Sequence, residues 1–301
     1  MKPKAGSMEH RAGSMEKGVR RSSYRNVNRM NNKMTDGLTS ISKMPVLFLG
    51  HGSPMNAIEE NEFVEGFRKT GREIPRPRAI LCISAHWETR GTQVTAMEQP
   101  KTIHDFGGFP RKLFEVEYPA PGDPKLAREI INHFDDGKVL PDDSWGLDHG
   151  TWSVVRHLYP KADIPVIQLS LDYQKTPAQH YGLAKELSWL RNKGVLIIGS
   201  GNMVHNLRLA AWDKLTDAGY GYDWAFEAAL KMKQFILSGD HASLIHYPDR
   251  GEAFNLAVPT PEHFLPLLYI LALQKKDDLL SLFNDRIVGG SLAMTCVKIG
   301  N

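Results

Sequence analysis

From Met44 to the C-terminus, short apolar runs alternate with longer amphipathic segments, and few folds are compatible with this alternation. The runs are typical of buried strands, and the segments between them have the periodicity and capping residues of helices. The order strand, helix, strand predicts a mostly parallel or mixed sheet flanked by helices on both faces. Nothing after residue 44 resembles an interdomain linker. We therefore expect one α/β catalytic domain over residues 44–301.

Individual elements follow from the same pattern. Strands are expected at Val46–Leu49, Ala79–Ala85, Ile164–Leu171, Val195–Ile198, Ile287–Gly290 and Ser291–Ile299. Helices are expected at Glu60–Thr70, from Asp123 to about Phe134, from Thr176 to Gly194, at Asp223–Leu237 and at Pro261–Leu273. Thr260 is the expected N-cap of the last helix, and Pro266 is placed where it would delay or kink that helix.

Residues 1–43 differ in composition from the rest. The heptad KAGSMEH is nearly repeated as RAGSMEK, and an Arg-, Asn-, Ser- and Met-rich stretch without apolar periodicity follows. Too little apolar surface is present to offset the cost of ordering this segment, so we expect a disordered basic extension. A mitochondrial transit peptide is the competing interpretation, although early glutamates count against it.

Charge and composition exclude several classes of function. Residues 1–43 hold ten basic and three acidic residues, which leaves 27 basic and 31 acidic residues for the remainder. The expected domain is therefore mildly acidic, and no nucleic-acid partner is predicted. No apolar stretch approaches the roughly 20 residues that span a bilayer. Cys82 and Cys296 lie in apolar runs and are expected to be buried thiols, which fits a cytoplasmic protein.

Four histidines stand where the chain is expected to turn, each in a chemically unusual phrase. They are His51 in GHGSP, His86 in SAHW, His205 in GNMVHN and His263 in TPEH. The first three follow predicted strands, and the carboxyl ends of parallel strands converge on one crevice. Imidazoles brought to one crevice from distant parts of the chain suggest a catalytic metal centre. Taken singly, each could instead be an incidental turn histidine or a hydrogen-bonded core histidine.

Two further histidines lie in loops that could wall a planar substrate. His104 sits in IHDFGGFP and His149 in GLDHG, although simple loop packing would explain either one. The loop before His205 suits acid–base work near neutral pH, since the ordinary imidazole pKa is about 6.5. No G-x-S-x-G elbow and no H-E-x-x-H helix is present, which argues against a serine hydrolase and a zinc protease of those types.

Five phrases, taken in order and with their spacings, resemble the class III extradiol ring-cleavage dioxygenases, especially the bacterial 4,5-DOPA extradiol branch. They are LFLGHGSPM (47–55), SAHW (84–87), TIHDFGGFP (102–110), GNMVHN (201–206) and PTPEHFLPL (259–267). The resemblance covers the chain from about Met44 onward, and residues 1–43 have no counterpart in it.

This resemblance implies a non-haem Fe(II) enzyme that cleaves the ring of a catechol, DOPA or a related compound, with O₂. It implies His51, His86 and His263 as metal ligands, with Glu262 as an alternative third ligand because the wider class uses two histidines and a carboxylate. His205 corresponds to the acid–base histidine and is also a possible fourth ligand. His149 corresponds to an active-site position that assists catalysis or orients substrate, and His104 is a candidate substrate contact.

A second hypothesis keeps the same histidines but dispenses with oxygen chemistry. Three or four imidazoles also suit Zn²⁺, so a zinc hydrolase or zinc-binding protein is the alternative, and zinc can occupy the site even of an iron enzyme. Structural zinc sites usually draw ligands from closely spaced pairs, whereas these histidines span more than two hundred residues. The spacing therefore favours a catalytic centre.

Overall fold

The computed structural model describes residues 43–134, 137–217 and 219–301. The predicted disordered extension therefore lies outside the described residues, except for Lys43. The Lys43 ammonium lies 3.0 Å from the Asp278 carboxylate.

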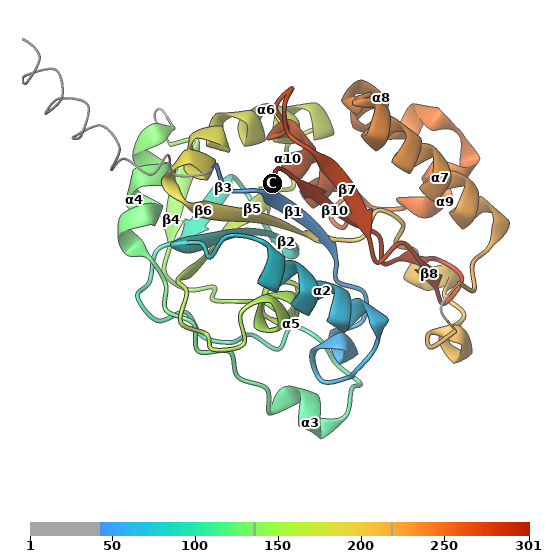
Figure 1. Ribbon diagram of the computed structural model, residues 1–301, viewed down its shortest axis with the longest axis horizontal. Helices are drawn as coiled ribbons and strands as arrows, with labels where there is room; N and C mark the ends of the chain where they lie inside the picture. The colour runs from blue at the N-terminus through green and yellow to red at the C-terminus, as the bar shows by residue number, and fades with distance from the viewer. Residues whose placement is uncertain (1–42, 135–136, 218) are drawn as a thin grey trace, which may run out of the picture. The chain divides into compact units, whose positions relative to one another are not determined.

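The strands are β1 (Val46–Gly50), β2 (Ala79–Thr89), β3 (Thr92–Thr95), β4 (Val139–Asp142), β5 (Val166–Asp172), β6 (Val195–Gly201), β7 (Leu280–Phe283), β8 (Ile287–Val288), β9 (Leu292–Ala293) and β10 (Cys296–Ile299). Eight of them form one sheet in the order β4-β3-β5-β2-β6-β1-β10-β7, and β8 pairs with β9 separately. Strands β5, β2, β6 and β1 are parallel, whereas β10 and β7 extend the sheet in antiparallel fashion (Figure 1). The sheet is therefore mixed around a parallel centre.

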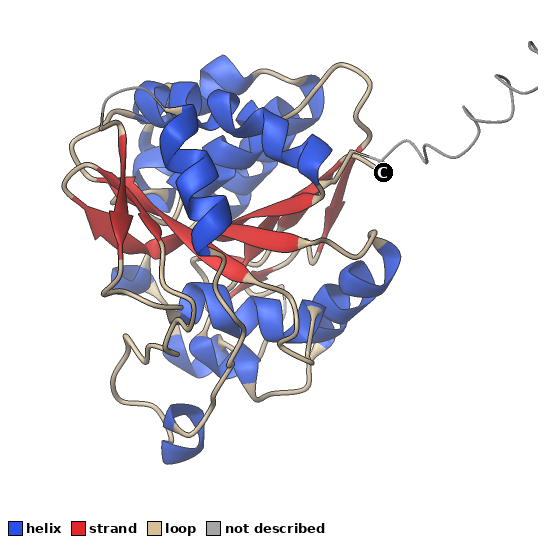
Figure 2. Ribbon diagram, turned by 90° about the vertical axis from the view of Figure 1, so that its left-hand side faces the viewer, coloured by secondary structure: helices blue, strands red, loops and turns tan. Residues whose placement is uncertain are grey.

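The α-helices are α2 (Glu62–Glu73), α3 (Arg111–Phe114), α4 (Pro124–His133), α5 (His149–Leu158), α6 (Pro177–Glu186), α7 (Asp223–Ser238), α8 (His241–Ile245), α9 (Glu252–Ala257) and α10 (Leu265–Ala272). Short 3₁₀ helices are η1 (Pro54–Ala57), η2 (Leu187–Lys193), η3 (Leu207–Leu209), η4 (Trp212–Lys214) and η5 (Tyr247–Arg250). Figure 2 shows helices on both sides of the sheet. The predicted α/β architecture is confirmed.

The central strands are buried on both faces because alternate side chains enter two different cores. Leu47 and Leu49 of β1 pack in a core with residues of α2 and α5. Val46 and Phe48 of the same strand pack in the opposite core, with residues of α4, α6 and α10. This arrangement explains why the strands appear in the sequence as continuous apolar runs.

Several predicted boundaries need correction. The helix expected from Thr176 to Gly194 is α6 followed by the tighter 3₁₀ helix η2, and Gly194 ends it with a left-handed φ of 71°. The helix expected over Pro261–Leu273 begins only at Leu265, because Pro266 is tolerated in a first turn but not further inside a helix. Thr260 does not cap it, and its hydroxyl instead donates to Glu262 over 2.8 Å.

Other corrections concern strands. The predicted strand Ser291–Ile299 is divided into β9 and β10, and β3, β4 and β7 were not predicted. These three are four-residue strands near the edges of the sheet, where alternation is too short to be distinctive. None of the described helices has both the length and the apolarity needed to cross a membrane. Cys82 and Cys296 are buried free thiols, as expected.

Candidate metal centre

Five histidines gather beyond the carboxyl ends of the parallel strands. His51 directly follows β1, His86 lies near the end of β2, and His205 follows β6. His149 is the first residue of α5, and His263 lies in the turn before α10. The strand-end argument predicted that His51, His86 and His205 would meet. His263 joins them from the turn before α10, and His149 joins them from the start of α5.

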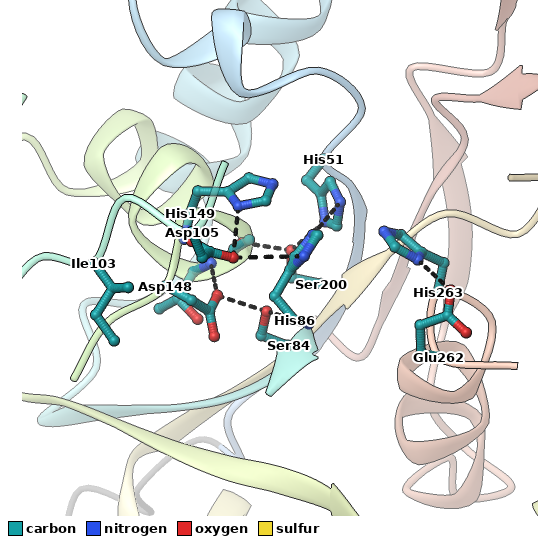
Figure 3. A network of polar contacts seen from close by, with 12 residues as sticks. His51, Ser84, His86, Ile103, Asp105, Asp148, His149, Ser200, Glu262 and His263 are labelled. Carbon is teal, nitrogen blue, oxygen red and sulfur yellow. Dashed lines mark hydrogen bonds and ion pairs between the residues drawn. The ribbon is translucent and has the colours of Figure 1, made fainter. Parts of the chain in front are cut away.

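His51, His86 and His263 form a nearly equilateral group. Their ring centroids are separated by 5.0 Å (His51–His86), 5.3 Å (His51–His263) and 5.0 Å (His86–His263). The Nε2 atoms of His51 and His86 lie 3.2 Å apart. His263 lies across the site from these two residues, and its ring points toward His51 and His86 (Figure 3). Centroid separations of about 5 Å are expected for three imidazoles bound to one ion at about 2.1 Å.

Backbone contacts fix the loop that carries His51. The His51 amide donates to the Gly201 carbonyl over 3.1 Å, which joins the ends of β1 and β6. The Asn56 side chain donates to the His51 carbonyl over 2.9 Å and is itself held by Asn61. The position of this imidazole is therefore set by the adjacent strand end and by η1.

His86 depends on a close approach between β2 and α5. The register of β2 shifts between Ile83 and Glu88, so His86 lies within an irregular part of the strand. Its amide donates to the Ser84 hydroxyl over 3.2 Å. A Cβ atom at Gly150 would lie 2.5 Å from Ser84 Oγ and 2.8 Å from His86 Cδ2. Only glycine at the start of α5 leaves room for this packing.

Hydrogen bonds fix which nitrogen of His51 carries its proton. Ser200 Oγ donates its single proton to the Gly150 carbonyl over 2.5 Å. The same oxygen lies 3.0 Å from His51 Nδ1, so it must accept a proton from that nitrogen. The lone pair of His51 is therefore on Nε2, the atom that faces His86. This is the tautomer that metal ligation through Nε2 requires.

His149 and His263 are oriented by carboxylates. His149 Nδ1 lies 2.9 Å from Asp105, which also accepts the His149 amide over 2.9 Å. His263 Nδ1 lies 3.1 Å from Glu262. Donation from Nδ1 in each case leaves the lone pair on Nε2, the carboxylate–histidine arrangement common around bound metals.

The donor atoms fall into two sets by distance alone. One comprises His51, His86 and His149, and the other comprises His205, Glu262 and His263. The His86 and His149 rings, however, are only 3.9 Å apart, closer than neighbouring ligands of one ion are expected to lie. Nearly equal separations favour His51, His86 and His263 as the set that faces a single ion. The donors present fit a metal that prefers imidazole nitrogen.

Burial keeps these imidazoles neutral. It lowers the pKa of His51 and of His263 well below the ordinary value, and repulsion from the neighbouring histidines lowers both further. Burial, followed by repulsion from His149, lowers the pKa of His86 to about 3. Neutral imidazole is the form that ligates metals, so the site is prepared for binding without first losing protons.

Comparison with known proteins identifies the family. Residues 38–286 match the model described as the catalytic LigB subunit of aromatic ring-opening dioxygenase. The chain belongs to this family. The sequence resemblance is thereby confirmed, and the protein is a dioxygenase of the ring-opening type.

Individual relatives agree with the family. The chain is 42% identical to the "4,5-DOPA dioxygenase extradiol" of Escherichia coli K12, with 88% of this chain and 98% of the relative covered. It is 35% identical to the Beta vulgaris protein of the same name, with 83% and 94% covered. A crystal structure of an uncharacterised E. coli K12 protein, 40% identical, superposes with a TM-score of 0.72 and covers 85% of this chain and all of that one.

In this ring-opening dioxygenase, His205 lies against His263 rather than between His51 and His86. The two rings are stacked at 3.5 Å with an interplanar angle of 6°. The His205 amide donates to the Ala257 carbonyl over 2.8 Å, which anchors the loop. Burial lowers the pKa of His205 to about 4, so its imidazole is also neutral near pH 7 and able to accept a proton.

Aromatic side chains line the approach to His149. The Phe106 ring lies edge-on to His149 at 5.5 Å and 5.0 Å from Phe114. His104 is behind Phe106, and its Nε2 donates to the Val116 carbonyl over 2.9 Å. The structure thus places His104 outside the five-histidine group, where it supports this aromatic wall.

Three polar residues of the site were not singled out from the sequence. Asp105 stands next to His104 in the phrase IHDFGGFP, and Asp148 caps α5 just before His149. Asp148 also accepts the Ser84 hydroxyl over 2.6 Å, and burial raises its pKa. Ser200 lies near the end of β6, and no sequence motif pointed to it. The sequence signal for Asp105 and Asp148 was that each lies directly next to a loop histidine, His104 or His149.

Proposed function

We propose that the protein cleaves the ring of a catechol beside its diol, using O₂ at a non-haem metal held by His51, His86 and His263. The single observation that supports this most is the near-equilateral group of three imidazoles, whose pKa values burial lowers so that they stay neutral. DOPA or a closely related catechol is the proposed substrate, since two relatives carry that name.

Fe(II) is the proposed working metal. When bound, it supplies the positions at which a catecholate and O₂ meet, and facial protein ligands leave such positions open. Zn²⁺ also accepts imidazole ligands and would occupy the same site without supporting the redox reaction. Glu262 accepts a hydrogen bond from His263 Nδ1. This contact supports a role for Glu262 in orienting His263, in preference to a role as the third metal ligand.

We assign His205 to proton transfer. Its neutral imidazole lies against the proposed ligand His263, close enough to take a proton from a catechol hydroxyl bound beside it. Such a group should act on chemistry more than on metal affinity. His205 as a fourth ligand remains the competing assignment.

His149 is proposed to orient the substrate or oxygen. Asp105 accepts both its amide and its Nδ1 proton, so the ring cannot rotate freely and presents Nε2 to the site. Phe106 lies against the same ring and would pack on a planar substrate. In our proposal His104 acts on the substrate indirectly, by supporting Phe106.

The zinc-hydrolase alternative is not favoured by the family match, which is to ring-opening dioxygenases. No nucleic-acid partner is proposed. Two buried free thiols support a reducing compartment such as the cytoplasm.

The test compares iron- and zinc-loaded protein. The metal-free chain is loaded anaerobically with either ion, given DOPA, and exposed to air. We expect the iron form alone to consume O₂ and form a yellow ring-fission product in equal amounts. A panel of catechols with anionic, neutral and cationic side chains would then rank substrates. Absence of O₂ uptake by the iron form with every catechol would refute the proposal, and equal turnover by the zinc form would refute the redox role of iron.

A further inference from the structure

A cavity separate from the five clustered histidines lies between α2, α3 and α5. Its volume is about 560 Å³, and none of the five clustered histidines lines it. Four basic side chains do: Arg68 and Arg72 from α2, Lys112 from α3 and Arg156 from α5. They come from three separate helices, so the fold, and not a single charged segment, brings them together.

The lining carries more positive than negative charge. Glu60 and Glu117 are its carboxylates, against four basic groups. Arg68 Nη2 lies 2.7 Å from Glu60, so this pair is mutually compensated. Within the described part of the chain, Lys112 and Arg156 form no ion pair with a carboxylate. Arg72 is also paired, because its Nη2 atom lies 2.6 Å from Glu65 on the same helix. The lining cations without an ion pair are therefore Lys112 and Arg156, and Glu117 is the lining carboxylate that opposes them.

Among the lining residues, Arg156 has the surroundings that most favour a bound anion. Its Nη1 atom is buried and has no hydrogen-bond partner among the described residues. Burial and then repulsion from Arg68 lower the pKa of Arg156, so its surroundings disfavour an uncompensated positive charge. A buried unsatisfied donor on a cation is costly, and an anion with several acceptor oxygens would satisfy it.

We propose that this cavity binds a phosphate group, either as inorganic phosphate or as a phosphomonoester. Guanidinium groups present a planar fork of donors that matches phosphate oxygens, and the negative charge of a phosphate would compensate Arg156 and Lys112, the two lining cations without an ion pair. The volume leaves room for an organic group attached to the phosphate. This inference is independent of the proposed reaction, because it uses none of the residues assigned to the metal centre.

Calorimetric titration of the full chain, in its metal-loaded form, tests the proposal. Inorganic phosphate and phenyl phosphate are titrated separately at low ionic strength, where screening is weak. We expect saturable binding with one site for at least one of them. Tighter binding of phenyl phosphate would identify an ester as the ligand, and equal or tighter binding of inorganic phosphate would identify the free ion.

Variants locate the site. Arg156→Gln should weaken binding by about tenfold or more, since it removes a charged hydrogen bond. Lys112→Gln, at an exposed position, should weaken it by several-fold and serves if Arg156→Gln folds poorly. Arg111→Gln removes the same charge from the neighbouring residue, which pairs with Glu115 outside the cavity, and should leave binding unchanged. Absence of saturable binding, or equal weakening by Arg111→Gln and Lys112→Gln, would overturn the proposal.

Discussion

At the scale of single residues, the site depends on which ring nitrogen each histidine keeps free. Ser200, Asp105 and Glu262 take the Nδ1 protons of His51, His149 and His263, respectively. In the proposed assignment these partners do not bind the metal, and they direct the Nε2 lone pairs of His51, His149 and His263. Substituting these residues one at a time therefore distinguishes metal ligands from groups that orient a ligand or transfer a proton.

The ligand and acid–base roles predict opposite results for metal and turnover. His51→Ala and His86→Ala should lose the metal. His205→Ala should retain most of it and lose turnover by about 10²–10⁴-fold, the usual size of general acid–base catalysis. Metal content by elemental analysis, read beside the rate of catechol cleavage, distinguishes these outcomes. Metal-free His205→Ala protein would make His205 a fourth ligand and contradict the assignment.

Asp105 offers a test of orientation. Asp105→Asn keeps the shape but weakens the acceptor for His149 Nδ1, so kcat should fall by about tenfold or more while metal content stays unchanged. Asp213→Asn, which neutralises an exposed carboxylate outside the site, is the matched control. An Asp105→Asn enzyme with unaltered kcat would show that this hydrogen bond has no catalytic importance.

At the scale of elements, the start of α5 packs so closely against the end of β2 that no space is left for a side chain at Gly150. Gly150→Ala would place a methyl group against Ser84 and His86, and overpacking of this kind costs about 1–3 kcal/mol. Gly182→Ala in α6 is the control, because nothing lies within 4 Å of its added Cβ atom and the substitution should stabilise by about 0.4–1 kcal/mol. Urea unfolding of both variants measures the difference. Equal stabilities would contradict the close packing of α5 against β2.

Much of this scale could be predicted from the sequence. Continuous apolar runs indicated the buried parallel strands, and the histidines after them were therefore expected to converge. Which histidine each polar partner contacts could not be predicted, because Ser200 meets His51 and Asp105 meets His149 only through tertiary packing. The late start of α10 is one of the two effects expected of Pro266, and the sequence could not choose between a delay and a kink because Pro261 also offered a plausible first turn.

At the scale of the whole molecule, a buried arginine joins distant parts of the chain. Arg191 is fully buried and donates to the carbonyls of Met44 and Leu273 and to the Asp278 carboxylate over 2.6 Å. It thus connects the segment before β1, the end of α10 and the loop before β7. Although burial opposes ionisation, the bonds from Arg191, the Lys275 amide and Lys43 lower the pKa of Asp278 to about 2.

This pair predicts a pH-dependent contribution to stability. Because the folded pKa of Asp278 lies below the unfolded value, the stabilisation is present above about pH 4 and is lost as pH falls toward 2. Asp278→Asn should lower the free energy of unfolding by about 2–4 kcal/mol at pH 7, and the difference from the parent should shrink below pH 4. Urea unfolding across this range provides the measurement. A difference that stays constant with pH would refute the ionic origin.

The most direct test of the whole account is a crystal structure of the anaerobically iron-loaded protein, with iron located by its anomalous scattering. We predict one iron within about 2.0–2.2 Å of the Nε2 atoms of His51, His86 and His263, with His149 and His205 outside bonding distance. Iron bound through His149 in place of His263, or through the Glu262 carboxylate, would contradict the account.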